Sequence, residues 1–292
     1  MEAAGSKIRT AGLSVASNSV LVVAKVAAGI VSGSVGILAE ALHSAVDLVA
    51  AVIALVAVRV ADNPADDSHA YGHGKYENLS GTVEAVLLIG AAVYLIYEGV
   101  ARIIHNAEVE QLGFGMAVMF ASGAINWLVS ARLFKVARET DSIALEADGQ
   151  HLRLDVYTSL GVFAGLVAVQ LTGLAIIDRL IGMGVALWIA WVGVRLSQQA
   201  LGPLMDSQLP EQELEQITSI LDSERKVLGF HKLRTRKSGA QRHIDVHLLV
   251  QDNMSVAEAH QVAEEVEDQI RGELDNVTVV THVEPEGDEP PA

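Results

Sequence analysis

Two His-x-x-x-Asp pairs lie inside otherwise apolar stretches of the sequence: His43 with Asp47, and His151 with Asp155. A spacing of four places both side chains of a pair on one helical face, one turn apart. Two such faces turned together offer two imidazole nitrogens and two carboxylate oxygens, a tetrahedral set suited to Zn²⁺ and similar ions. Isolated polar residues in helix packing are the alternative. However, an aspartate at a membrane-helix centre costs about 2.5–3.5 kcal/mol, which a bound dication offsets.

Two further clusters have residue types that bind metals. Asp66, His69 and His73 lie in the polar segment between the second and third apolar stretches, where a solvated loop with turn-forming glycines is the alternative interpretation. The second cluster follows residue 201. Its members are His231, His247, His260, His282 and Glu284. A small sheet could gather these residues at one end; the alternative is that they are scattered surface histidines without a common role.

The apolar stretches predict a membrane domain. The chain is 51% hydrophobic with a mean hydropathy of +0.35. Six segments are long enough to cross a bilayer, which takes about 20 apolar residues; they lie near 11–32, 34–59, 78–103, 112–134, 143–171 and 174–198. Asp47 and Asp155 each lie about a dozen residues into their helices, which places both near the middle of the membrane.

The distribution of basic residues predicts the orientation. With six spans both termini lie on one side, and nearly all basic residues close to span ends lie on that side. They are Lys7, Arg9, Arg59, Lys75, Arg132, Lys135, Arg138 and Arg195. The opposite side has Arg102. Because cytoplasmic loops are enriched in Lys and Arg, both termini are expected in the cytoplasm.

The periodicity changes after about residue 201. The pattern predicts a helix over 211–221, strands over 227–236 and 242–250, and a last strand over 277–283. Between the last two strands, Ser255 and Glu258 form a capping box that opens a helix ending near residue 271. We therefore expect a six-span transmembrane domain at 1–201, a cytoplasmic α+β domain (αββαβ) at 202–284, and an acidic flexible tail at 285–292.

Composition excludes several classes of protein. The chain has no cysteine, which excludes disulfide scaffolds and thiolate metal sites. A net charge of −16 excludes a nucleic-acid binder, which would be basic. An intramembrane metalloenzyme and a membrane metal sensor are two possible interpretations of the metal-binding residue types. The sequence has no His-Glu-x-x-His motif, which a metalloenzyme of this kind would use. A metal sensor would not need the two His-x-x-x-Asp pairs inside the membrane.

Four segments in the same order resemble the cation diffusion facilitator family of divalent-metal/proton antiporters, which includes bacterial zinc exporters. They are Gly33–Asp47, His69–Glu77, Ala147–Asp155 and His231–Gly239. The resemblance implies a six-helix all-α transmembrane domain and a metallochaperone-like, ferredoxin-like cytoplasmic domain. It also implies a homodimer in the inner (cytoplasmic) membrane, with both termini cytoplasmic.

The resemblance further implies roles for each cluster. His43, Asp47, His151 and Asp155 would form the transport site, and Asp66, His69 and His73 a loop site. A binuclear site at the dimer interface would use His231, His247, His260 and His282, with Glu284 where some members have Asp. A transport site of two His and two Asp resembles that of the zinc-preferring members of the family. This resemblance implies Zn²⁺ as the main substrate, Cd²⁺ as a second substrate and protons as the counter-substrate. Zn²⁺ would also be a structural or regulatory ligand.

Overall fold

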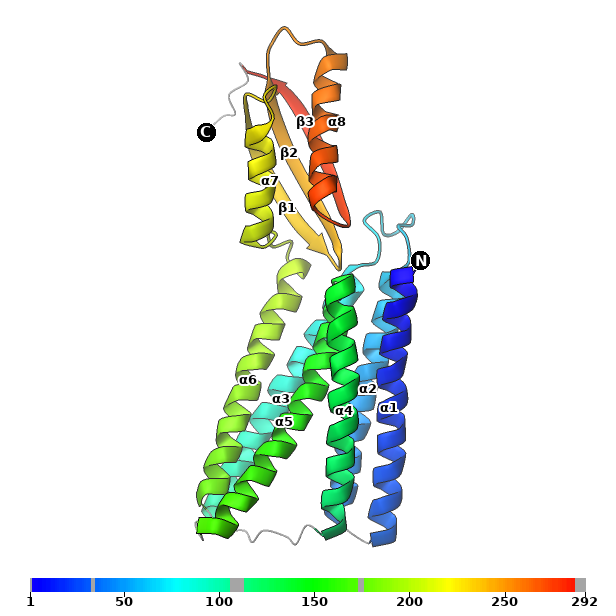
Figure 1. Ribbon diagram of the computed structural model, residues 1–292, viewed down its shortest axis with the longest axis vertical. Helices are drawn as coiled ribbons and strands as arrows, with labels where there is room; N and C mark the ends of the chain where they lie inside the picture. Colours follow the sequence, from blue (N-terminus) through cyan, green and yellow to red (C-terminus); the bar gives the residue numbers. More distant parts are fainter. Residues whose placement is uncertain (1, 33–34, 106–112, 173–175, 287–292) are drawn as a thin grey trace. The chain divides into compact units, whose positions relative to one another are not determined.

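Six long helices make up the first of two units into which the chain divides, residues 1–201 and 202–292 (Figure 1). The computed structural model describes residues 2–32, 35–105, 113–172 and 176–286. The six helices are α1 (Glu2–Ser32), α2 (Val35–Ala61), α3 (Lys75–His105), α4 (Gly113–Thr140), α5 (Ile143–Thr172) and α6 (Ile176–Leu204). The expected all-α membrane domain of six helices is therefore confirmed.

The helices are longer than the apolar segments that predicted them. α4 continues to Thr140 and α1 begins at Glu2, several polar residues beyond the hydrophobic runs. Hydropathy marks where the membrane ends, whereas a helix continues until a residue breaks it. By length and composition, Gly5–Val31, Ala41–Ala61 and Lys75–Tyr97 could each cross a membrane, in a search restricted to the described residues.

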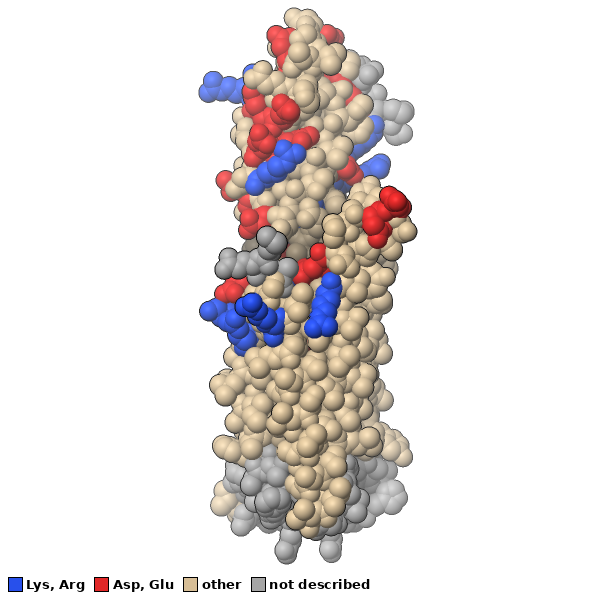
Figure 2. All heavy atoms as spheres, turned by 90° about the vertical axis from the view of Figure 1, so that its right-hand side faces the viewer, with Lys and Arg blue, Asp and Glu red and all other residues tan. Residues whose placement is uncertain are grey.

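Helix α5 belongs to both hydrophobic cores of the first unit. One core joins α1, α2, α4 and α5 through residues such as Ala11, Val58, Leu133 and Leu152. The other joins α3, α5 and α6; its members include Ala85, Ala147, Leu154 and Ile189. The many buried alanines allow close helix approach, as expected for membrane helices. On the face in Figure 2, charged side chains of this unit gather toward one end of the helices.

The second unit is a three-stranded sheet with two helices on one face. Its elements are α7 (Glu211–Ser223), β1 (Gly229–Ser238), β2 (Gln241–Val250), α8 (Val256–Glu273) and β3 (Val277–Pro285), in the expected αββαβ order. The strand order is β1-β2-β3, with β1 antiparallel and β3 parallel to β2. Alternate residues of β2, such as Ile244 and Leu248, are buried against Ile217 of α7 and Val266 of α8. The other face of the sheet carries the intervening side chains.

Local sequence signals account for the ends of these elements. The Ser255 hydroxyl accepts a hydrogen bond from the backbone amide of Glu258, and the Glu258 carboxylate accepts one from the backbone amide of Ser255. The predicted capping box is therefore confirmed. The β1–β2 turn uses Gly239 at φ +59°. The last strand continues to Pro285, two residues beyond its expected end, because 284 and 285 still pair with β2. Of the predicted tail, 287–292 lie outside the described residues.

Candidate functional site

The two His-x-x-x-Asp pairs meet between α2 and α5. His151 Nε2 lies 2.9 Å from Asp47 Oδ1, and His43 Nε2 lies 3.9 Å from Asp155 Oδ1. Each histidine thus approaches the aspartate of the other pair, as expected for two helices that cross the bundle in opposite directions. Asp47 and His151 are buried, at 5% exposure each.

The spacing of these four side chains is close to that of a metal site. Ligand atoms of His43, Asp47 and Asp155 all lie within 4.8 Å of one another, and His151 contacts Asp47. In a tetrahedral zinc site with bonds of about 2.0–2.1 Å, ligand atoms lie about 3.4 Å apart. Shifts of about 1 Å would therefore bring the donors into coordination distance. One buried oxygen of Asp155 and the Nδ1 of His151 have no hydrogen-bond partner among the described residues.

A basic residue between the two α5 ligands is directed away from the site. The Arg153 Nε donates to the Ser130 hydroxyl of α4 at 3.0 Å, and its guanidinium stacks over Trp127 at 3.9 Å. A fixed positive charge is therefore kept off the face that carries His151 and Asp155, which leaves their charge available to a cation.

The loop between α2 and α3 brings its three expected residues together. Asp66 lies 3.2 Å from His69 Nδ1 and 3.3 Å from His73 Nε2, and the two rings are 4.4 Å apart. Backbone amides of Ser68 and His69 donate to the Asp66 carboxylate. The hydrogen bond from the His69 amide is the main reason why the pKa of Asp66 lies below its ordinary value. The carboxylate is thereby kept ionised, which is the state that binds a metal.

In the second unit, strand register forms a row of histidines. His231 of β1 pairs with His247 of β2, which pairs with His282 of β3. Glu284 lies on the same face, with its carboxylate 2.8 Å from His231 Nε2, 2.6 Å from His247 Nδ1 and 3.6 Å from His282 Nε2. The contact with His247 is the main cause that lowers the pKa of Glu284.

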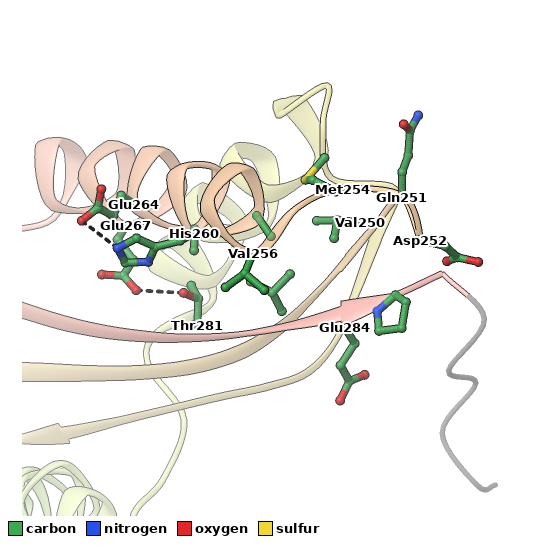
Figure 3. A pocket seen from close by; sticks show the side chains of 14 residues that line it. Val250, Gln251, Asp252, Met254, Val256, His260, Glu264, Glu267, Thr281 and Glu284 are labelled. Carbon is green, nitrogen blue, oxygen red and sulfur yellow. Dashed lines mark hydrogen bonds and ion pairs between the residues drawn. The ribbon is translucent and has the colours of Figure 1, made fainter.

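His260 does not join this row within one chain. It lies on α8, where its Nε2 is 3.4 Å from Glu264, and its side chain is 71% exposed. Figure 3 shows His260 on the helix side of β3 and Glu284 projecting from the opposite face. His231, His247 and Glu284 form a group whose ligand atoms lie within 4.8 Å of one another. Of the five expected residues, His260 is therefore separated from the rest by the sheet.

The sequence reasoning did not identify two buried charged clusters in the first unit. Lys7 of α1 binds Asp62 at 2.5 Å and Glu77 at 3.0 Å, and Glu77 also accepts from the Ser142 hydroxyl. Glu84 of α3 is fully buried. A signal was present for Glu84, because an ionisable residue inside a predicted span has a functional or structural partner as a rule. Lys7, Asp62 and Glu77 lie just outside the predicted spans, where charged residues are ordinary.

Comparison with known proteins agrees with both units. Residues 12–205 match the profile described as the cation efflux transmembrane domain, and residues 209–286 match the cation efflux protein cytoplasmic domain. The chain is 37% identical to the uncharacterized transporter sll1263 of Synechocystis sp., over 89% of this chain and 84% of that one. It is 33% identical to the cation-efflux pump FieF of Escherichia fergusonii, over 95% and 92% of the two chains.

Among solved structures, the metal-bound C-terminal domain of the CzcD transporter from Thermotoga maritima is 27% identical. That match covers 27% of this chain and 98% of the other, with a TM-score of 0.26. The two profile matches together cover most of the sequence, and the FieF match extends over nearly all of it. The chain is a cation efflux transporter rather than an enzyme, and it belongs to the cation diffusion facilitator family.

Proposed function

We propose that this protein exports a divalent metal ion from the cytoplasm in exchange for protons, by alternating access around His43, Asp47, His151 and Asp155. The observation that carries the proposal is the cross-pairing of the two His-x-x-x-Asp motifs in the interior of the α2–α5 contact. Metal enters from the cytoplasm, the helices rearrange, protons from outside displace the metal, and the protonated site returns inward.

Ligand chemistry supports Zn²⁺ as the main substrate and Cd²⁺ as a second one. Two imidazole nitrogens suit zinc, whereas manganese and magnesium prefer all-oxygen sites. Metal binding needs neutral imidazole and ionised carboxylate, so it displaces protons. An unperturbed imidazole titrates near pH 6.5, within the range that a proton gradient covers.

The two other clusters fit supporting roles. We assign Asp66, His69 and His73 to a cytoplasmic loop site. The histidine row with Glu284 is assigned to a regulatory or structural zinc site. We further propose a homodimer in the inner membrane with cytoplasmic termini, in which His260 completes the second unit's site from across the dimer. The basic residues at span ends support this orientation.

The test is zinc flux into proteoliposomes with and without an imposed pH gradient. Wild type is compared with Asp155→Ala, and Asp222→Ala, an exposed aspartate on α7, is the matched control. We expect gradient-driven uptake in the wild type and the control, and its loss in Asp155→Ala. Circular dichroism should show that all three proteins remain folded.

The opposite result has a clear meaning. Equal flux in wild type and Asp155→Ala would show that the pairs have a structural role only. In that case the clusters outside the membrane would have to account for metal binding, and a metal sensor would become the better interpretation.

A further inference from the structure

Glu84 is a carboxylate buried inside the helical unit. It is 0% exposed, and neither of its carboxylate oxygens has a hydrogen-bond partner among the described residues. Asp148 of α5 is 3% exposed, and its Oδ2 is likewise unpartnered. An ionised carboxylate that has lost its water and found no partner is strongly disfavoured. The group becomes stable by holding a proton or by facing a cation.

Helix register places the two carboxylates side by side. At Gly81 a Cβ would lie 3.4 Å from Ile143, so α3 and α5 approach closely there. One turn further along each helix, Ala85 and Ala147 share one hydrophobic core. Glu84 and Asp148 are the direct neighbours of these alanines, so the two lie within one helical turn of each other along the helix axes, and Asp148 is among the charged groups that interact with Glu84.

The electrostatic surroundings connect Glu84 to the transport site. The charged groups that interact with it are Asp148 and His151, both on α5. Helices α2 and α6 also pack against α3. Among the described residues, Asp47 of α2 interacts with Asp148, as do His151 and Asp155 of α5, and α6 adds no charged group to the pair. His151 contacts Asp47 in the proposed transport site, so a charge arriving there changes the electrostatic environment of Glu84.

The geometry favours a proton over a metal at Glu84. Among the described residues, three groups bring three possible ligand atoms within 4.8 Å, and neither Glu84 nor Asp148 belongs to any of them. A lone carboxyl beside a second acid is instead suited to share or hold a proton.

We propose that Glu84, with Asp148 beside it, is a second proton-binding site of the transporter. Glu84 holds a proton while the transport site is empty and releases it when metal binds there. This inference rests on the proposed proton-coupled transport. The arriving dication favours the ionised carboxylate. The O–H bond breaks, the electron pair stays on Glu84, and the proton leaves to the cytoplasm. After the metal departs, a proton from outside restores the acid.

The proposal is tested by the ratio of protons to zinc ions exchanged in proteoliposomes, with a pH dye and a zinc dye read together. Glu84→Gln keeps the shape of the side chain but cannot titrate. We expect it to transport zinc with about one proton fewer per metal. Glu84→Asp should restore the ratio, and Glu139→Gln, an exposed residue of α4, should leave it unchanged.

The outcomes separate this inference from the proposed function. An unchanged ratio in Glu84→Gln, with a coupled wild type, overturns the role of Glu84 alone. Zinc uptake by the wild-type protein that does not depend on the pH gradient would overturn proton coupling itself. If Glu84→Gln stops uptake, a second measurement tests the proposal: the number of protons released when zinc binds to the purified protein. The release from Asp155→Ala is subtracted, so that only protons displaced by binding at the transport site are counted. Equal release in wild type and Glu84→Gln would then refute the proposal.

Discussion

Replacing Lys7 by Met should destabilise the helical unit strongly, and a second substitution should restore part of the loss. Lys7 joins α1 to Asp62, just after α2, and to Glu77 at the start of α3. The Glu77 side chain is only 2% exposed and also accepts from Ser142, which precedes α5. One ammonium group therefore links four helices at one end of the unit.

The magnitude follows from what each variant leaves behind. Lys7→Met strands a buried Glu77 carboxylate, and removing one partner of a buried ion pair costs about 3–5 kcal/mol. Glu77→Gln leaves Lys7 bound to Asp62 and loses one charged hydrogen bond, at about 1–3 kcal/mol. The double variant strands only Asp62, whose side chain is 18% exposed and reaches water. The double variant should therefore be more stable than Lys7→Met alone.

Thermal unfolding of the purified full-length protein in detergent, followed by helical circular dichroism, measures this cycle. For a unit of about 200 residues, 1 kcal/mol shifts the Tm by about 2–4 °C, so Lys7→Met should lower it by roughly 10 °C. An exposed pair on α4, Lys135 and Glu139, is the control, and its removal should change stability by less than about 1 kcal/mol. Additive effects of Lys7→Met and Glu77→Gln would refute the reasoning, because a buried pair must show coupling.

Three further predictions concern the second unit. Arg242 donates hydrogen bonds to both carboxylate oxygens of Glu213 and so lowers the pKa of Glu213. The stability that this interaction contributes is fully present above the ordinary pKa of glutamate, and it is lost as the pH falls through the lowered pKa of Glu213. The protection of β2 amides from hydrogen exchange, corrected for the intrinsic exchange rate at each pH, should therefore fall at acid pH, and Arg242→Met should remove that dependence. Ser255→Ala should cost about 1 kcal/mol and speed exchange in the first turn of α8; unchanged rates would contradict the cap. Zinc at 100 times its Kd should stabilise the unit by about 2.7 kcal/mol, reversibly with chelator, and His247→Ala should abolish this shift.

Local chemistry made much of the fold predictable. The length of the apolar segments identified the six long helices, and the alternation of β2 identified its buried face. The capping box at Ser255 fixed the start of α8 to the residue. The ends of α1 and α4 were not predictable from hydropathy, because helix propensity continues through polar residues beyond the membrane.

The candidate site was less accessible to sequence reasoning. Spacing places His43 with Asp47 on one face, but only the packing of α2 on α5 determines which histidine meets which aspartate. The position of His231 depends on a bulge before Arg234, where Lys232 takes φ 50°, and lysine gives no local sign of a left-handed backbone. Contacts between distant helices also decide whether a buried acid such as Glu84 finds a partner.

The histidine row makes the length of β2 as important as its composition. Side chains of a strand alternate between faces, so one inserted residue reverses every later position. An insertion after Asp245 would turn His247 toward the helices and Leu248 toward the open face, removing the cluster and the core at once. The same insertion at 251–254, between β2 and α8, would change only a connection. A one-residue insertion within β2 should therefore prevent this unit from folding, whereas the same insertion at 251–254 should be tolerated.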